Sequence, residues 1–198
     1  GRPNLCERRM PGRGVLPDGP TRMSLGGKPV YHYGHVATYA SRTVVHESSA
    51  IAIDRSVPLD RAALVGCSVM TGVGAVINTA AVPAGASMAV FGAGGVGLNV
   101  VQGGALVAAH PVIAVDLRAS RLEHARALGA TRLVDATRED APAAIRRITR
   151  LGADYTFVAV GDTRAVTQAI EALAPGGTCV LIGVPETGAT LPLDVRPL

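Results

Sequence analysis

The chain has 198 residues, which is enough for one large domain or for one complete domain and part of another. Charged residues make up 17% and hydrophobic residues 48%, a balance typical of a sheet covered by helices on both faces. The net charge is +4, but the arginines are dispersed and lack interleaved aromatic residues, which argues against a nucleic-acid-binding surface. Three widely spaced cysteines do not suit a disulfide framework, and no targeting signal is recognisable. We therefore expect a reducing, cytoplasmic location.

The first 58 residues are predicted to form the β-rich end of a domain whose other parts lie outside this sequence. Prolines and glycines punctuate residues 1–30, so turns and loops should dominate there. Short apolar runs at residues 36–45 and 49–53 are typical of antiparallel strands. The chain is accordingly divided into residues 1–58 and residues 59–198.

A long stretch without Asp, Glu, Lys or Arg covers residues 62–115. A helix is predicted to begin at Pro58 or Asp60 and, after an interruption marked by glycines, to continue to Thr79. Asparagines, glycines and Pro83 divide the stretch into apolar runs shorter than the roughly 18 residues that a membrane span needs. We therefore expect a buried parallel sheet and no membrane span.

From Ser87 onward, predicted strands and helices alternate. The strands are expected at residues 87–91, 112–116, 132–134, 154–160 and 178–184. A capping box of Ser120 and Glu123 should begin the helix after the second strand, and Gly129 should end it. Right-handed helical crossovers between these strands give an α/β fold with a doubly wound parallel sheet, in which the sixth strand of a complete Rossmann domain is missing.

The first of these strands leads into a glycine-rich turn. Gly92 suits the tight turn, Gly94 lets the backbone approach a pyrophosphate, and Gly97 packs the next helix on the sheet. The phosphates would lie on free N–H groups at the start of that helix. Asp116 follows Gly97 by nineteen positions and ends the second strand. Its carboxylate can accept both hydroxyls of an adenosine ribose and would repel a 2′-phosphate, so NAD is favoured over NADP.

A glycine turn by itself is weak evidence, because many strand-to-helix turns carry glycines for packing alone. Two other interpretations stay open at this point. One is a related nucleotide-binding fold, such as a methyltransferase, and the other is a structural turn without a ligand.

Two segments, LVGCSVMTGVG at residues 64–74 and VFGAGGVG at residues 90–97, resemble the zinc-dependent alcohol dehydrogenases of the medium-chain dehydrogenase/reductase superfamily. Residues 1–7 are similar to the end of the structural-zinc lobe of that family. The resemblance covers essentially the whole chain. It implies an oxidoreductase that transfers a hydride between an alcohol or aldehyde and NAD, with a GroES-like catalytic domain before the Rossmann domain.

The resemblance also implies roles for two cysteines and a threonine. Cys67 matches one of three protein ligands of a catalytic zinc, and Thr71 matches a residue that packs by the nicotinamide ring. Without the family, a cysteine such as Cys67 in an apolar helix would be interpreted as a small buried hydrophobic residue. Cys6 resembles the last of four cysteines that bind a structural zinc, and its three partners would lie before Gly1.

Further positions match coenzyme contacts of the family. Gly95 and Val96 belong to the pyrophosphate turn, and Arg121 matches a basic residue near the adenosine ribose. Backbone groups of Ile182 and Val184 would lie near the nicotinamide end.

We expect the chain to be a fragment of a longer enzyme and inactive by itself. The intact enzyme would act on a small-molecule alcohol or aldehyde as a homodimer or homotetramer, without nucleic acid or membrane. Two alternatives remain: an NAD-binding module without catalysis, and a zinc-free relative of the quinone reductases. Cys6 and Cys67 count against the second alternative.

Overall fold

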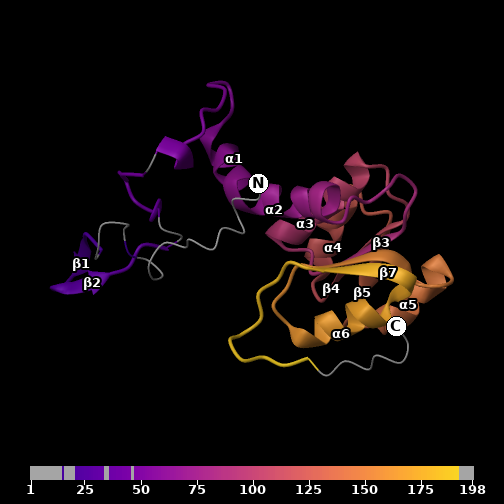
Figure 1. Cartoon of the computed structure of the whole chain (residues 1–198). Coiled ribbons are helices and arrows are strands. Elements are labelled where there is room, and N and C mark those ends of the chain that lie inside the picture. Colours follow the sequence, from indigo (N-terminus) through magenta and orange to yellow (C-terminus); the bar gives the residue numbers. More distant parts are fainter. Residues whose placement is uncertain (1–14, 16–20, 34–35, 46, 192–198) are drawn as a thin grey trace. The chain divides into compact units, whose positions relative to one another are not determined.

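The computed structural model describes residues 15, 21–33, 36–45 and 47–191. Within it, the chain separates into two compact units between Ser56 and Val57 (Figure 1). Cys6 lies outside the described residues, so its predicted role in a structural zinc site stays a prediction.

The first unit contains a short antiparallel hairpin. Strands β1 (Met23–Leu25) and β2 (Lys28–Val30) pair with Met23 opposite Val30. Gly26 and Gly27 connect them with φ values of +56° and +76°, a pair of left-handed conformations that suits a two-residue hairpin turn. The hairpin therefore lies in a segment that the sequence predicted to be loop.

The strands predicted at residues 36–45 and 49–53 are wrong. None of the described residues in these two ranges belongs to a strand, and a 3-10 turn, η3 (Glu47–Ser49), lies between them. A strand needs a hydrogen-bonded neighbour as well as an apolar sequence, and the described part of this unit offers these segments none.

The second unit is built on a five-stranded parallel sheet in the order β5-β4-β3-β6-β7. The strands are β3 (Met88–Phe91), β4 (Val112–Asp116), β5 (Arg132–Asp135), β6 (Ala153–Val158) and β7 (Leu173–Leu181). After β3, the chain first builds the sheet outward through β4 and β5, and then returns to add β6 and β7 on the other side. This order confirms the doubly wound Rossmann sheet, and it makes the carboxyl ends of β3 and β6 the switch point, where such folds bind ligands.

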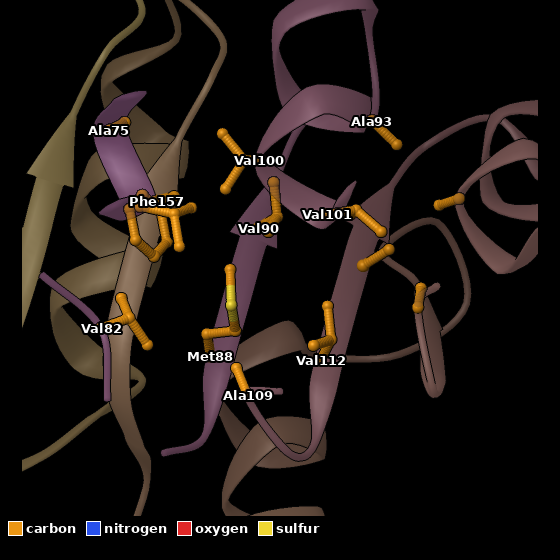
Figure 2. Close-up of a cluster of buried hydrophobic side chains, with 14 of the residues drawn as sticks. Ala75, Val82, Met88, Val90, Ala93, Val100, Val101, Ala109, Val112 and Phe157 are labelled. Atoms are coloured by element: carbon orange, nitrogen blue, oxygen red, sulfur yellow. The ribbon is translucent and has the colours of Figure 1, made fainter. Parts of the chain in front are cut away.

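Four helices cover the two faces of this sheet. They are α3 (Gly95–Leu106), α4 (Ala119–Ala127), α5 (Ala141–Thr149) and α6 (Thr163–Glu171). Because successive strand residues point to opposite faces, Met88 and Val90 pack under α3 and α4 together with Phe157 (Figure 2), whereas Phe91 packs with Ile145 of α5 on the other face. Both faces are buried, which explains the continuous apolar strands of the sequence.

A continuous helical segment, Leu59–Thr79, precedes the sheet. It consists of α1 (Leu59–Leu64), the π-helical turn η4 (Val65–Val69), α2 (Met70–Gly74) and the π-helical turn η5 (Ala75–Thr79). The predicted interruption at glycines is therefore wrong. Gly72 serves close packing instead, because a Cβ there would lie 2.5 Å from the Val96 carbonyl oxygen of α3.

The apolar runs in this part of the sequence were judged too short for a membrane span, and the continuous helix shows that this judgement was wrong. The helix has 21 residues and contains an 18-residue stretch with a mean hydropathy of 1.6, so by length and composition it could cross a membrane. Core helices of soluble proteins pass the same test, and one such helix is weak evidence for a membrane span.

Strand β7 begins earlier than predicted. It starts at Leu173, opposite Ala153, and ends at Leu181, whereas the sequence placed the strand at residues 178–184. The pairing register shifts between Ala153 and Tyr155, because residues on both sides of the Pro-Gly-Gly sequence pair with β6. The sequence Pro175-Gly176-Gly177, which is typical of a turn, therefore forms an irregularity inside β7.

Candidate cofactor and metal site

The glycine turn after β3 has the geometry that the sequence predicts. Gly92 has φ +93°, a conformation that glycine adopts without strain, and its N–H donates to the Val115 carbonyl at 2.8 Å. A Cβ on Gly97 would lie 1.8 Å from the Gly92 carbonyl oxygen, so the start of helix α3 packs directly against the backbone of the glycine turn. A Cβ on Gly94 would meet nothing within 4 Å. The turn is thus closely packed on one side and open at Gly94.

The amino terminus of α3 lies at this open position. Gly94 is the N-cap, no side chain of the described residues caps the helix, and the Leu98 N–H makes a 2.8 Å bond to the Gly94 carbonyl. The N–H groups of Gly95, Val96 and Gly97 precede that first intrahelical bond. Together with the positive end of the helix dipole, they form a site suited to an anion such as a pyrophosphate.

Asp116 lies beside the turn, at the carboxyl end of β4, and its side chain is only 5% exposed. Its Oδ2 accepts the Ala93 N–H at 2.8 Å, and its Oδ1 accepts the Arg118 N–H at 2.9 Å. The Arg121 Nη1 lies 3.6 Å from Oδ2, and the arginine side chain is 42% exposed. The structure therefore brings together the glycine turn, the acidic residue and the arginine that the sequence singled out.

The same interactions correct the predicted start of α4. The helix begins at Ala119 with Arg118 as its N-cap, and no cap hydrogen bond from a side chain is formed there. The predicted capping box is wrong because Ser120 lies inside the helix and not before it. The Asp116 carboxylate, from the preceding strand, binds the Arg118 N–H instead.

Cys67 and Thr71 lie one turn apart on the Leu59–Thr79 helix, and both side chains are exposed. Cys67 is therefore not a small buried hydrophobic residue. The Ser68 Cβ is 3.9 Å from the position that a Cβ would take on Gly95, and Gly72 contacts α3. The helix that carries Cys67 thus packs next to the glycine turn.

The described residues do not form a complete metal site. Among them, no three His, Cys, Asp or Glu side chains lie close enough together to hold an ion. A catalytic zinc takes three protein ligands. Of the predicted zinc ligands, the described residues contain Cys67, so they do not fit a complete zinc centre by themselves.

Ile182 and Val184 follow β7 at the same edge of the sheet as the glycine turn. The Ile182 N–H donates to the Val158 carbonyl at 2.9 Å, which fixes the chain just after β7 against the end of β6. Val184 is exposed, and its carbonyl oxygen would lie 2.5 Å from a Cβ on Gly161. Both residues therefore lie at the carboxyl ends of the strands, and their role at the nicotinamide end stays a prediction.

Two residues of this region escaped the sequence analysis. Val160, just after β6, would contact a Cβ on Gly92 at 3.2 Å, and Ser68 lies by Gly95. The sequence offered one signal for each: Val160 follows a predicted strand, and Ser68 is the neighbour of Cys67 in the chain. A cavity of about 380 Å³ lies at the opposite edge of the sheet, beside Asp154 and Tyr155, and the predicted site residues do not line it.

Comparison with known proteins identifies the family of the chain. Residues 95–198 match a family described as zinc-binding dehydrogenases. The chain belongs to the zinc-binding dehydrogenase family. This result confirms the family resemblance drawn from residues 64–74 and 90–97.

Curated relatives and solved structures extend the match to the rest of the chain. The chain is 39% identical over 202 residues to the S-(hydroxymethyl)glutathione dehydrogenase of Photobacterium damsela subsp. piscicida, covering 100% of this chain and 54% of the relative. It is 39% identical over 191 residues to alcohol dehydrogenase-like 6 of Arabidopsis thaliana, covering 94% and 50% of the two chains.

An alcohol dehydrogenase zinc-binding domain protein from Burkholderia ambifaria has a TM-score of 0.86 at 37% identity, over 92% of this chain and 50% of its own. The benzyl alcohol dehydrogenase of Acinetobacter calcoaceticus has a TM-score of 0.81 at 32% identity, over 83% and 46%. The chain thus spans about half the length of the curated relatives it matches.

Proposed function

We propose that the chain is the coenzyme-binding part of an NAD-dependent zinc alcohol dehydrogenase that transfers a hydride between an alcohol or aldehyde and NAD. One observation carries this proposal. The open glycine turn, the Asp116 carboxylate and the helix with Cys67 meet at the carboxyl end of one parallel sheet. A dinucleotide needs the first two features, and a zinc-assisted hydride transfer needs a metal ligand beside them.

The residues present fit NAD. The N–H groups of Gly95, Val96 and Gly97 would hold the pyrophosphate, because Gly94 leaves the approach to them open. Asp116 would accept the adenosine ribose hydroxyls, and its charge would disfavour the 2′-phosphate of NADP. When bound, NAD supplies the hydride acceptor.

Arg121, Ile182, Val184 and Thr71 complete the proposed coenzyme site. Arg121 would lie by the adenosine ribose, where it already neighbours Asp116. The backbone of Ile182 and Val184 would border the nicotinamide end, and Thr71 would pack against the ring. Cys67 would contribute one thiolate to a catalytic zinc, whose chemistry is to polarise the substrate oxygen. The other zinc ligands must come from residues beyond those described.

A second candidate function is an NAD-binding module without catalysis. The absence of a three-ligand metal cluster among the described residues favours it for the chain taken alone. The first proposal includes a cytoplasmic location, a small alcohol or aldehyde substrate, and assembly as a homodimer or homotetramer. These three parts depend on that proposal being correct.

Turnover and metal content distinguish the two candidates. The experiment expresses the chain within its full reading frame, and measures zinc by elemental analysis and NAD reduction with benzyl alcohol and S-(hydroxymethyl)glutathione. An alcohol dehydrogenase should bind zinc and reduce NAD, and Cys67→Ser should abolish turnover with little change in NAD affinity. NAD binding without zinc or turnover would support the binding module instead.

A further inference from the structure

We propose that Asp116 has a second role: it holds the glycine turn in its binding shape before any coenzyme arrives. The inference rests on the proposed function, because it concerns the same site. It differs from ribose recognition, because it concerns the protein without ligand and the phosphate end of the site.

The geometry places one carboxylate between two loops. The Ala93 N–H belongs to the turn between β3 and α3, and the Arg118 N–H belongs to the turn between β4 and α4. Asp116 accepts the first through Oδ2 at 2.8 Å and the second through Oδ1 at 2.9 Å. Ala93 is fully buried, and the Asp116 side chain is nearly so. Hydrogen bonds to a charged acceptor in such surroundings are among the stronger ones in proteins.

The glycine turn needs such an attachment. Gly92 and Gly94 flank Ala93, and glycine leaves the backbone free to adopt many conformations. If the acceptor were lost, the buried Ala93 N–H would have to find another partner or remain unsatisfied, so the turn would tend to rearrange. Because the N–H groups of residues 95–97 follow directly, a rearranged turn would no longer present them together to a phosphate. Asp116 therefore acts on phosphate binding as a positioning residue.

This role and simple electrostatics predict opposite results for a phosphate ligand. Asp116 carries a negative charge next to the anion site, so by charge alone its neutralisation should strengthen the binding of pyrophosphate. If Asp116 holds the turn, neutralisation should weaken that binding, because the turn loses its preorganised shape. The sign of the change separates the two explanations.

The first test is amide hydrogen exchange in the ligand-free chain, followed by NMR. Asp116→Ala removes both acceptors, and we expect the Ala93 and Arg118 amides to exchange about ten- to a hundredfold faster. The Tyr155 amide is an internal control, because it bonds to the Ser87 carbonyl at the amino end of the sheet, away from the turn, and should be unchanged. Glu123→Gln leaves both hydrogen bonds and the Arg121–Asp116 ion pair in place, so it should leave all three rates unchanged.

Asp116→Asn is the second variant, in case the alanine variant does not fold. The amide keeps one acceptor oxygen and replaces the other with a donor, so one of the two loop amides should exchange faster. Unchanged exchange at both Ala93 and Arg118 would overturn the proposal. Equal acceleration at Ala93, Arg118 and Tyr155 would also overturn it, because that pattern reports general destabilisation of the fold.

The second test is titration with inorganic pyrophosphate, followed through the amide resonances of residues 95–97. Asp116→Asn should weaken binding at least threefold. Glu123→Gln is the matched charge control, because it removes a negative charge on α4 that pairs with Arg126 and not with the turn. Tighter binding by Asp116→Asn would refute the positioning role. If the wild-type chain binds neither pyrophosphate nor NAD, the proposed function fails, while the exchange experiment still decides the role of Asp116.

Discussion

Two glycines of the same turn should respond to alanine in different ways, because one is needed for packing and the other for a ligand. A Cβ on Gly97 would lie 1.8 Å from the Gly92 carbonyl oxygen, against about 3.4 Å for an ordinary contact, so helix and turn must separate by about 1.5 Å. Overpacking of this kind against backbone costs about 3 kcal/mol. We expect Gly97→Ala to lower the Tm by roughly 10 °C.

Gly94→Ala is the contrasting variant. Gly94 has φ −83°, which alanine tolerates, and a Cβ there meets nothing within 4 Å. As an N-cap, alanine is poorer than glycine by about 0.5–1 kcal/mol, so the Tm should fall by only a few degrees. NAD affinity should nevertheless fall at least tenfold, because the methyl group occupies the space through which the pyrophosphate approaches.

Calorimetric unfolding and isothermal titration with NAD measure the two effects. A Gly97→Ala protein as stable as wild type would refute the packing argument. Full NAD affinity in Gly94→Ala would show that the open side of the turn is not the phosphate site.

Three further predictions concern the acid, the thiols and the core. Asp116→Ala should weaken NAD binding about ten- to a hundredfold and improve the affinity for NADP relative to NAD, as measured by calorimetry; an unchanged ratio would contradict this. Cys67 should react with a thiol reagent faster than Cys179 in a peptide-mapped labelling time course, because Cys67 is exposed, whereas burial raises the pKa of the Cys179 thiol; faster labelling of Cys179 would show that its strand opens readily. Phe157→Ala should destabilise the fold by about 3–5 kcal/mol in denaturant unfolding, because the ring is fully buried, and a loss under 1 kcal/mol would mean that the sheet is loosely packed there.

The sequence predicted the second unit well because its signals are local and repeat along the chain. Buried strands are apolar along their whole length, so the sequence shows them as apolar runs. Gly129 ends α4 with φ +114°, a conformation typical of a glycine that ends a helix. The closeness of the glycine turn and Asp116 was predictable for the same reason, since Gly92 and Asp116 lie at the ends of adjacent parallel strands.

The failures arose where distant partners decide the structure. Arg118 caps α4 because the Asp116 carboxylate from the preceding strand binds its N–H, which no local capping motif indicates. Gly72 continues a helix because α3 lies against it, although a glycine there was interpreted as an interruption. Residues 36–45 carry apolar side chains but no strand, since apolar character alone does not supply a pairing partner.

We propose that the carboxyl ends of this sheet bind NAD and that Asp116 selects NAD over NADP. Isothermal titration of the chain with each coenzyme, under identical salt and pH, tests this claim most directly. We expect one NAD per chain, bound at least tenfold more tightly than NADP. Equal affinity for the two coenzymes, tighter binding of NADP, or no binding of NAD would contradict it.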